Sequence, residues 1–86
     1  MNDLDQLRQQ IDKIDDQIVA LLGQRFRLSL EVGTLKRKLN VTTYQAEREA
    51  TILKRVVEQG STLGLDRLLL QALFLQIFAV SRRDQE

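Results

Sequence analysis

The apolar residues of the first 39 positions recur in alternating steps of three and four, and this repeat sharply limits the folds open to the chain. The repeat consists of Leu4, Leu7, Ile11, Ile14, Ile18, Leu21, Leu28, Val32, Leu35 and Leu39. Such spacing places the apolar side chains on one stripe of a long helix that packs along much of its length. No proline interrupts the run. The pattern therefore predicts one continuous helix that ends before Asn40.

The predicted helix is too long to be packed by its own chain. About 36 helical residues span roughly 54 Å, which exceeds the width of a compact domain of this size. A chain of 86 residues also buries only a modest fraction of its surface and often gains stability by pairing. The simplest architecture is an intertwined homodimer.

A second helix is expected after a short polar break at 40–43. Threonine hydroxyls in this break can cap a helix that runs from about 45 to 59, where Gly60 supplies a stop signal. Segment 60–64 is then expected to form a turn.

A third helix is expected to begin after Asp66, which is a favourable capping residue. From Leu68 to Val80 it is apolar nearly all round, as is typical of the most buried helix of a fold. We therefore predict an all-α fold with three helices per chain and with residues 1–86 as a single domain.

The composition excludes several classes of function. Cysteine and histidine are both absent, so the chain cannot form disulfides, zinc sites of the thiolate or imidazole kind, or hydrolytic triads. Thirteen basic residues balance twelve acidic ones, which gives no sign of a nucleic-acid-binding surface. The start of the chain is polar and acidic, unlike a signal peptide, so we expect a soluble, cytoplasmic protein.

One slot of the apolar repeat, between Leu21 and Leu28, is filled by Arg25. Lys36 follows 11 residues later, close to three helical turns, so both cations lie on one face. A purely structural explanation is open for each, because Arg25 can form a buried ion pair and Lys36 can belong to a solvated helix end.

Polar residues also extend the apolar faces of the two shorter helices. Arg48 and Glu49 each lie four residues before an apolar position of the second helix, and Ser81 and Gln85 continue the stripe of the third. These four can also be ordinary pairs and helix ends. Together with Arg25 and Lys36, however, they predict a cavity for a small organic anion with more than one carboxylate, because arginine binds carboxylates bidentately.

Arg8 is the remaining candidate ligand for this anion. It lies 17 residues before Arg25, roughly 25 Å along the same helix. If Arg8 contributes to the same small site, it must come from the other chain of the dimer.

The ordered set of these residues resembles the all-helical chorismate mutases over essentially the whole chain. The matching pieces are Leu7-Arg8-x-x-Ile11-Asp12-x-Ile14-Asp15, Leu22-x-x-Arg25, Val32-Gly33-x-x-Lys36, Tyr44-x-x-Glu47-Arg48-Glu49 and Ser81-x-x-x-Gln85. Each piece alone is a weak signal, but the ordered set at these spacings is fairly specific. The resemblance implies an intertwined dimer with two equivalent sites for chorismate.

The resemblance also implies roles for the residues that hold the substrate. Arg25 and Arg48, with Arg8 from the partner chain, would bind the two carboxylates of chorismate, and Ser81 would assist at a carboxylate. Arg25 would then acquire an anionic ligand as its partner.

Three further residues are implied to act around the reacting bond and the ring. Lys36 and Gln85 would donate hydrogen bonds to the ether oxygen of the breaking bond, and Glu49 would accept one from the ring hydroxyl. Many members of the family read Tyr-Asp-Pro-Glu-Arg-Glu where this chain has Tyr44-Gln45-Ala46-Glu47-Arg48-Glu49. Gln45 therefore replaces an acid near the ring hydroxyl and is included among the predicted substrate-binding residues.

The implied reaction, chorismate to prephenate, is compatible with a chain that lacks cysteine and histidine. It is a unimolecular rearrangement that needs no nucleophile, metal or cofactor, only a chair-like conformer and stabilisation of the negative charge that develops on the ether oxygen. We accordingly expect no metal and no cofactor.

Three other functions remain open at this point. An isochorismate-pyruvate lyase or a 4-amino-4-deoxychorismate mutase would use the same scaffold. The amino substrate stays open as an alternative because Gln45 replaces the acid near the ring substituent. A non-catalytic helical dimerisation or regulatory module is the alternative from another class, and it predicts that Arg25 pairs with an internal carboxylate.

Overall fold

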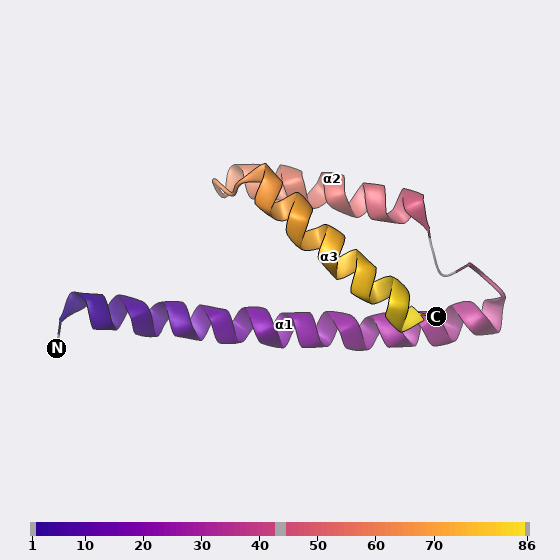
Figure 1. Cartoon of the computed structure of the whole chain (residues 1–86), viewed down its shortest axis with the longest axis horizontal. Coiled ribbons are helices and arrows are strands. Elements are labelled where there is room, and N and C mark those ends of the chain that lie inside the picture. Colours follow the sequence, from indigo (N-terminus) through magenta and orange to yellow (C-terminus); the bar gives the residue numbers. More distant parts are fainter. Residues whose placement is uncertain (1, 43–44, 86) are drawn as a thin grey trace.

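The computed structural model describes residues 2–42 and 45–85, and within them it shows three helices and no strand (Figure 1). The helices are α1 (Asp3–Leu39), α2 (Ala46–Thr62) and α3 (Arg67–Gln85). The predicted all-α class is confirmed. Thr43 of the predicted break and Tyr44 of the family motif lie outside the described residues.

Helix α1 is continuous over 37 residues, as the apolar repeat predicts, and it is capped at both ends. At its start the side-chain oxygen of Asn2 accepts a hydrogen bond from the backbone N–H of Asp5 at 2.7 Å. At its end Asn40 adopts a left-handed conformation with φ 57°, and the N–H of Val41 donates to the carbonyl of Lys36 at 2.9 Å. Asparagine tolerates this conformation, so the helix ends where the sequence predicts.

The predicted end of the second helix at Gly60 is wrong. Helix α2 continues to Thr62, and Gly60 is a buried helical residue against which Leu70 of α3 packs. The left-handed residue that ends the helix is Gly64, with φ 73°, and Leu65 N–H donates to the Gly60 carbonyl at 2.9 Å. Gly60 thus serves close helix packing, while Gly64 serves the turn.

Helix α3 begins as predicted, because the Asp66 carboxylate accepts hydrogen bonds from the backbone N–H groups of Leu68 and Leu69 at 2.7 and 3.3 Å. It crosses diagonally between the other two helices and packs on both of them (Figure 1). The residues buried where the helices meet are Ser29 and Gly33 of α1, Ile52 and Gly60 of α2, and Leu70, Ile77, Phe78 and Ser81 of α3.

The expectation that α3 is buried all round is wrong for the single chain. Leu68, Leu69 and Leu75 are 73%, 58% and 52% exposed. Only one face of α3 meets α1 and α2, so its other face has no intrachain cover among the described residues.

The first half of α1 extends beyond the other two helices (Figure 1). Its apolar stripe is 51–62% exposed, and consists of Leu4, Leu7, Ile11, Ile14, Ile18 and Leu21. The radius of gyration is 16.4 Å, against about 12 Å for a compact chain of this length. The chain by itself is therefore elongated and leaves much apolar surface open. None of the described helices combines the length and apolarity required to span a bilayer.

Candidate active site

A cavity of about 350 Å³ lies where the three helices meet, and seven of the eight predicted site residues line it. They are Arg25 and Lys36 of α1, Gln45, Arg48 and Glu49 at the start of α2, and Ser81 and Gln85 of α3. The apolar part of the wall is formed by Leu28, Val32, Ile52 and Phe78. The volume is typical of sites that bind small organic ligands.

The eighth predicted residue, Arg8, does not line the cavity of its own chain. It is exposed in the first half of α1, about 25 Å from Arg25 at the helical rise per residue. The suggestion that Arg8 serves a site in another chain stays a prediction.

Arg25 is held in the cavity wall by Ser81, which in turn is hydrogen-bonded to Ser29. Its Nη1 donates to Ser81 Oγ at 2.9 Å, and Ser29 Oγ lies 3.2 Å from the same oxygen. Both serines are buried, with 6% and 7% exposure for Ser29 and Ser81. The guanidinium is therefore fixed in direction while other N–H groups remain for a ligand.

Burial lowers the pKa of Arg25, and the nearby cations Arg48 and Arg55 lower it further. Within the described chain the groups that act on Arg25 are thus a neutral serine and two like charges. The internal carboxylate partner that a purely structural role predicts for Arg25 is not found there. Its charge is balanced when an anion enters the cavity.

Lys36 and Gln85 form the second polar cluster of the cavity. Lys36 Nζ donates to Gln85 Oε1 at 2.6 Å. Because the oxygen of the Gln85 amide accepts this bond, the Gln85 NH₂ group points its N–H donors elsewhere. Lys36 and Gln85 thus bring a cationic and a neutral donor group to the same part of the cavity.

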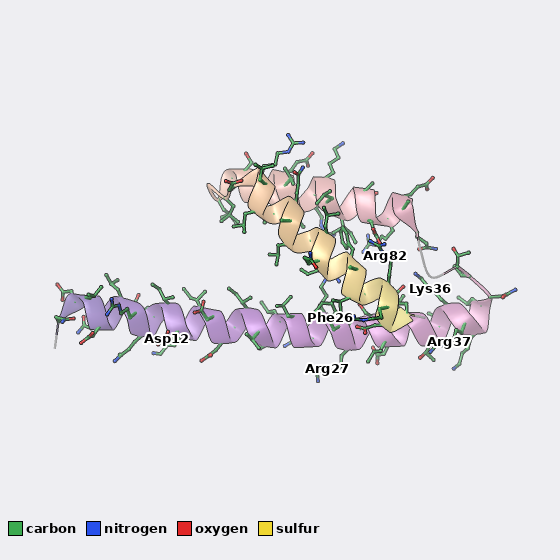
Figure 2. The ribbon with its side chains drawn as sticks, in the orientation of Figure 1. Asp12, Phe26, Arg27, Lys36, Arg37 and Arg82 are labelled. Carbon is green, nitrogen blue, oxygen red and sulfur yellow. The ribbon has the colours of Figure 1, made fainter. Side chains whose placement is uncertain are left out.

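Gly33 leaves room for the backbone of α3 at Gln85 to lie close against α1. A Cβ at Gly33 would lie 2.7 Å from Gln85 Cα, which is closer than real Cβ contacts. Arg37 adds a hydrogen bond from Nη1 to the Gln85 carbonyl at 3.3 Å, and Figure 2 shows Lys36 and Arg37 at the end of α3. Both α1 residues thus fix the last turn of α3 over the cavity.

The third polar cluster joins α2 to α3. Arg82 Nε lies 3.0 Å from Glu49 Oε2, and both residues line the cavity. Arg82 can be found in Figure 2. Arg48 and Gln45 are exposed at the cavity rim. Glu49 is the one carboxylate among the described lining residues, against four cations, Arg25, Lys36, Arg48 and Arg82. The cavity is therefore suited to an anion.

Two polar lining residues, Ser29 and Arg82, are missing from the site predicted by the sequence. Ser29 lies four residues after Arg25, so helical spacing alone would have placed it on the same face. Arg82 lies next to Ser81 in a polar C-terminal stretch, where a basic residue is expected for the helix end alone. Nothing in its spacing distinguishes it from Arg83.

No group of three or more acidic side chains that could hold a metal ion occurs in the described ranges. The cavity instead offers N–H donors from arginine, lysine and glutamine, and a few hydroxyls. Such a set binds and orients an oxyanion, and it stabilises negative charge that develops during a reaction.

The chain is similar to several proteins of known sequence or structure. A bifunctional chorismate mutase/prephenate dehydratase of Aquifex aeolicus is 37% identical over 57 residues, which are 66% of this chain and 16% of that protein. A chorismate mutase of Methanocaldococcus jannaschii is 34% identical over 53 residues, 62% of this chain and 54% of that protein. The chain thus spans only part of the length of these curated relatives.

A solved structure agrees with the fold along the full chain. It is a conserved hypothetical protein of Pyrococcus furiosus with a TM-score of 0.80 and 31% identity, and the match covers 100% of this chain and 99% of that one. The family model described as chorismate mutase type II matches residues 7–86, which include α1 from its second turn onward and both shorter helices. Because this model covers most of the chain, the chain belongs to the chorismate mutase type II family.

Proposed function

We propose that the chain is a chorismate mutase, that it rearranges chorismate to prephenate, and that residues 1–86 act as one domain. The observation that carries the proposal is the pair Lys36–Gln85, joined at 2.6 Å in a cavity that three arginines also line. These two donors face a space that suits an organic dianion. Family membership supports the identity of that dianion.

The arginines bind the substrate in this proposal. Arg25 and Arg48 take the carboxylates of chorismate, with Arg8 of the partner subunit, and Ser81 assists at a carboxylate. Bidentate contacts from guanidinium groups hold the ring and the enolpyruvyl side chain in one arrangement. Restricting the substrate to a chair-like conformer removes an entropic part of the barrier.

Lys36 and Gln85 act on the reacting bond. The carbon–oxygen bond of the ether breaks while a carbon–carbon bond forms, and negative charge builds on the ether oxygen in the transition state. Both residues donate to that oxygen, so they stabilise the transition state more than the ground state. Glu49 accepts a hydrogen bond from the ring hydroxyl, and Gln45 lies beside it at the rim.

An intertwined homodimer belongs to the same proposal. The exposed apolar stripe of α1 and the open face of α3 need a cover that the described residues of one chain do not supply. A second copy, laid along α1, covers the stripe and brings its own Arg8 toward the cavity. Burial of this apolar surface is the driving force for pairing. A cytoplasmic location remains a prediction from the sequence.

The test is to incubate the purified protein with chorismate, and separately with isochorismate, and to identify products by NMR. We expect prephenate from chorismate and loss of about a hundredfold or more in kcat in Lys36→Ala, because an oxyanion-type donor is removed. Lys38→Ala is the matched control, since Lys38 is exposed two residues further along α1 and does not line the cavity.

Two other results would overturn the proposal. Pyruvate and salicylate from isochorismate would make the protein an isochorismate-pyruvate lyase on the same scaffold. No turnover of either compound, with no thermal stabilisation by a bicyclic transition-state analogue, would favour a non-catalytic helical module.

A further inference from the structure

Glu49, the single carboxylate among the described lining residues, already has a cationic partner within the cavity. Arg82 Nε of α3 lies 3.0 Å from Glu49 Oε2 of α2. The side chains are 40% and 20% exposed, so the pair contributes little to stability. Its effect falls instead on the charge that a ligand meets at this end of the cavity.

We propose that Arg82 makes the site selective for a substrate whose ring carries a neutral hydroxyl, and against one whose ring carries a protonated amino group. The inference rests on the proposed function, in which Glu49 contacts the ring substituent. Glu49 alone would attract an ammonium group as readily as it accepts a bond from a hydroxyl. The charge of Arg82 removes that attraction.

The geometry makes the effect direct. A ring substituent that bonds the Glu49 oxygen facing Arg82 lies within about 6 Å of the guanidinium, given a hydrogen bond of about 2.8 Å. Two positive charges at that separation repel appreciably even in a partly hydrated site. Arg25 and Lys36 of α1 and Arg48 of α2 add further positive charge around the same space. No second carboxylate among the described lining residues offsets them.

Arg82 is held in place for this role by its neighbour in the chain. Ser81 is buried and accepts the hydrogen bond of Arg25, which fixes the register of α3 against α1. The next residue along the helix is then directed toward α2, where it meets Glu49. Arg83, one step further, is exposed and does not line the cavity.

The test compares kcat/KM for chorismate and for 4-amino-4-deoxychorismate in four proteins: the unaltered chain, Arg82→Gln, Arg82→Lys and Arg83→Gln. Near neutral pH we expect Arg82→Gln to raise the amino-to-hydroxyl ratio of kcat/KM about tenfold, because one nearby positive charge is lost. Arg82→Lys keeps the charge and is expected to keep most of the selectivity. Arg83→Gln is expected to leave the ratio unchanged.

Varying the pH of the assay distinguishes an effect of charge on the substrate amine from a change in the shape of the cavity. Well above the pKa of the substrate amine, measured on the free compound, the amine is neutral and the difference between Arg82→Gln and the unaltered chain is expected to disappear. A difference in the kcat/KM ratio that is caused by a disturbed cavity shape would persist at high pH. An unchanged ratio in Arg82→Gln near neutral pH, or a tenfold change that persists at high pH, would overturn the inference.

Failure of the proposed function gives a different result. If the unaltered chain turns over neither compound, the mutase assignment fails, and selectivity is then read from the two dissociation constants by calorimetry. The same tenfold change in their ratio is expected in Arg82→Gln. Its absence in binding, or no binding of either compound, would overturn the inference as well.

Discussion

Arg25 carries a charge that its surroundings in the described chain oppose rather than balance. Burial, Arg48 and Arg55 all lower its pKa, and its hydrogen-bond acceptor, Ser81, is neutral. A site that holds cations together without a ligand is destabilised until an anion binds. Such a cost in stability is common where a site is shaped for its ligand.

We expect Arg25→Met to stabilise the ligand-free protein by up to about 1 kcal/mol, because methionine fills the space of the arginine stem without its charge. The same substitution should abolish stabilisation by a dianionic transition-state analogue, which for the unaltered protein reaches about 2.7 kcal/mol at a hundred times Kd. Thermal unfolding at a fixed protein concentration, with and without the analogue, measures both effects.

Arg27→Met is the control for this substitution, since Arg27 is exposed two residues along α1 and does not line the cavity. It should bind the analogue normally. A ligand-free Arg25→Met protein that unfolds more easily than the unaltered one would mean that Arg25 has a stabilising partner, as in a purely structural role.

Single site residues could be predicted where their position in the helical repeat was unusual for a polar side chain. Arg25 stands in an apolar slot, and Lys36, Arg48 and Gln85 continue helical faces, so the sequence alone brought them to one cavity. Arg82 breaks no pattern, and its importance depends on where α2 ends up relative to α3. The packing of α2 against α3 is tertiary structure, which helical periodicity does not predict.

Between elements, Gly33 is the residue that determines how closely α3 approaches α1. Its missing Cβ leaves space for the backbone of Gln85, and the Lys36–Gln85 hydrogen bond depends on that approach. Gly23 lies on the same helix, but a Cβ there would meet no atom within 4 Å. The two glycines of α1 are therefore a natural pair for separating helix propensity from packing.

Gly33→Ala is expected to lower kcat about tenfold to a hundredfold, because the last turn of α3 must move and carry the Gln85 amide away from the ether oxygen. Gly23→Ala should leave kcat unchanged and stabilise the protein by up to about 1 kcal/mol through helix propensity. Steady-state kinetics and urea unfolding of both variants test this. Equal kcat values for the two would show that α3 adapts without disturbing Gln85.

The connection from α2 to α3 shows where sequence reasoning about elements fails. Both Gly60 and Gly64 are candidate stop signals in the sequence, and Gly60 was predicted to end the second helix. The choice depends on Leu70, which packs against Gly60 only after α3 has folded back on α2. The end of α1 and the start of α3 were predictable because their caps are local.

Gly64→Ala should destabilise the protein by about 1 kcal/mol, since a Cβ at φ 73° is sterically unfavourable. Gly64→Asn should cost less, because Asn40 adopts the same left-handed conformation at the end of α1. The free energies of unfolding are compared by urea titration at one protein concentration. A cost for asparagine as large as that for alanine would contradict this explanation of the turn.

For the whole molecule, the features that the single chain leaves unexplained have a common cause. The α1 stripe, the outer face of α3 and the large radius of gyration all reflect apolar surface that lacks a cover among the described residues. The sequence predicted this from helix length alone, because a helix of this length exceeds a compact domain. The prediction that α3 is the most buried helix is wrong for the single chain, because an all-round apolar composition does not show what covers each face of a helix.

The proposed dimer can be tested through Arg8, which lies outside its own chain's cavity. If each site takes Arg8 from the partner subunit, Arg8→Ala and Lys36→Ala chains are both nearly inactive alone, yet a mixed dimer contains one site with both residues intact. After the two variants are unfolded together and refolded at equal amounts, random pairing leaves about a quarter of all sites unaltered, because a two-fold dimer has two equivalent sites. Specific activity should therefore return to about a quarter of the unaltered value, while a mixture of the separately refolded proteins stays inactive until subunits exchange. If Arg8 served its own chain's cavity, every site in every dimer would lack one residue, and activity would not return at all.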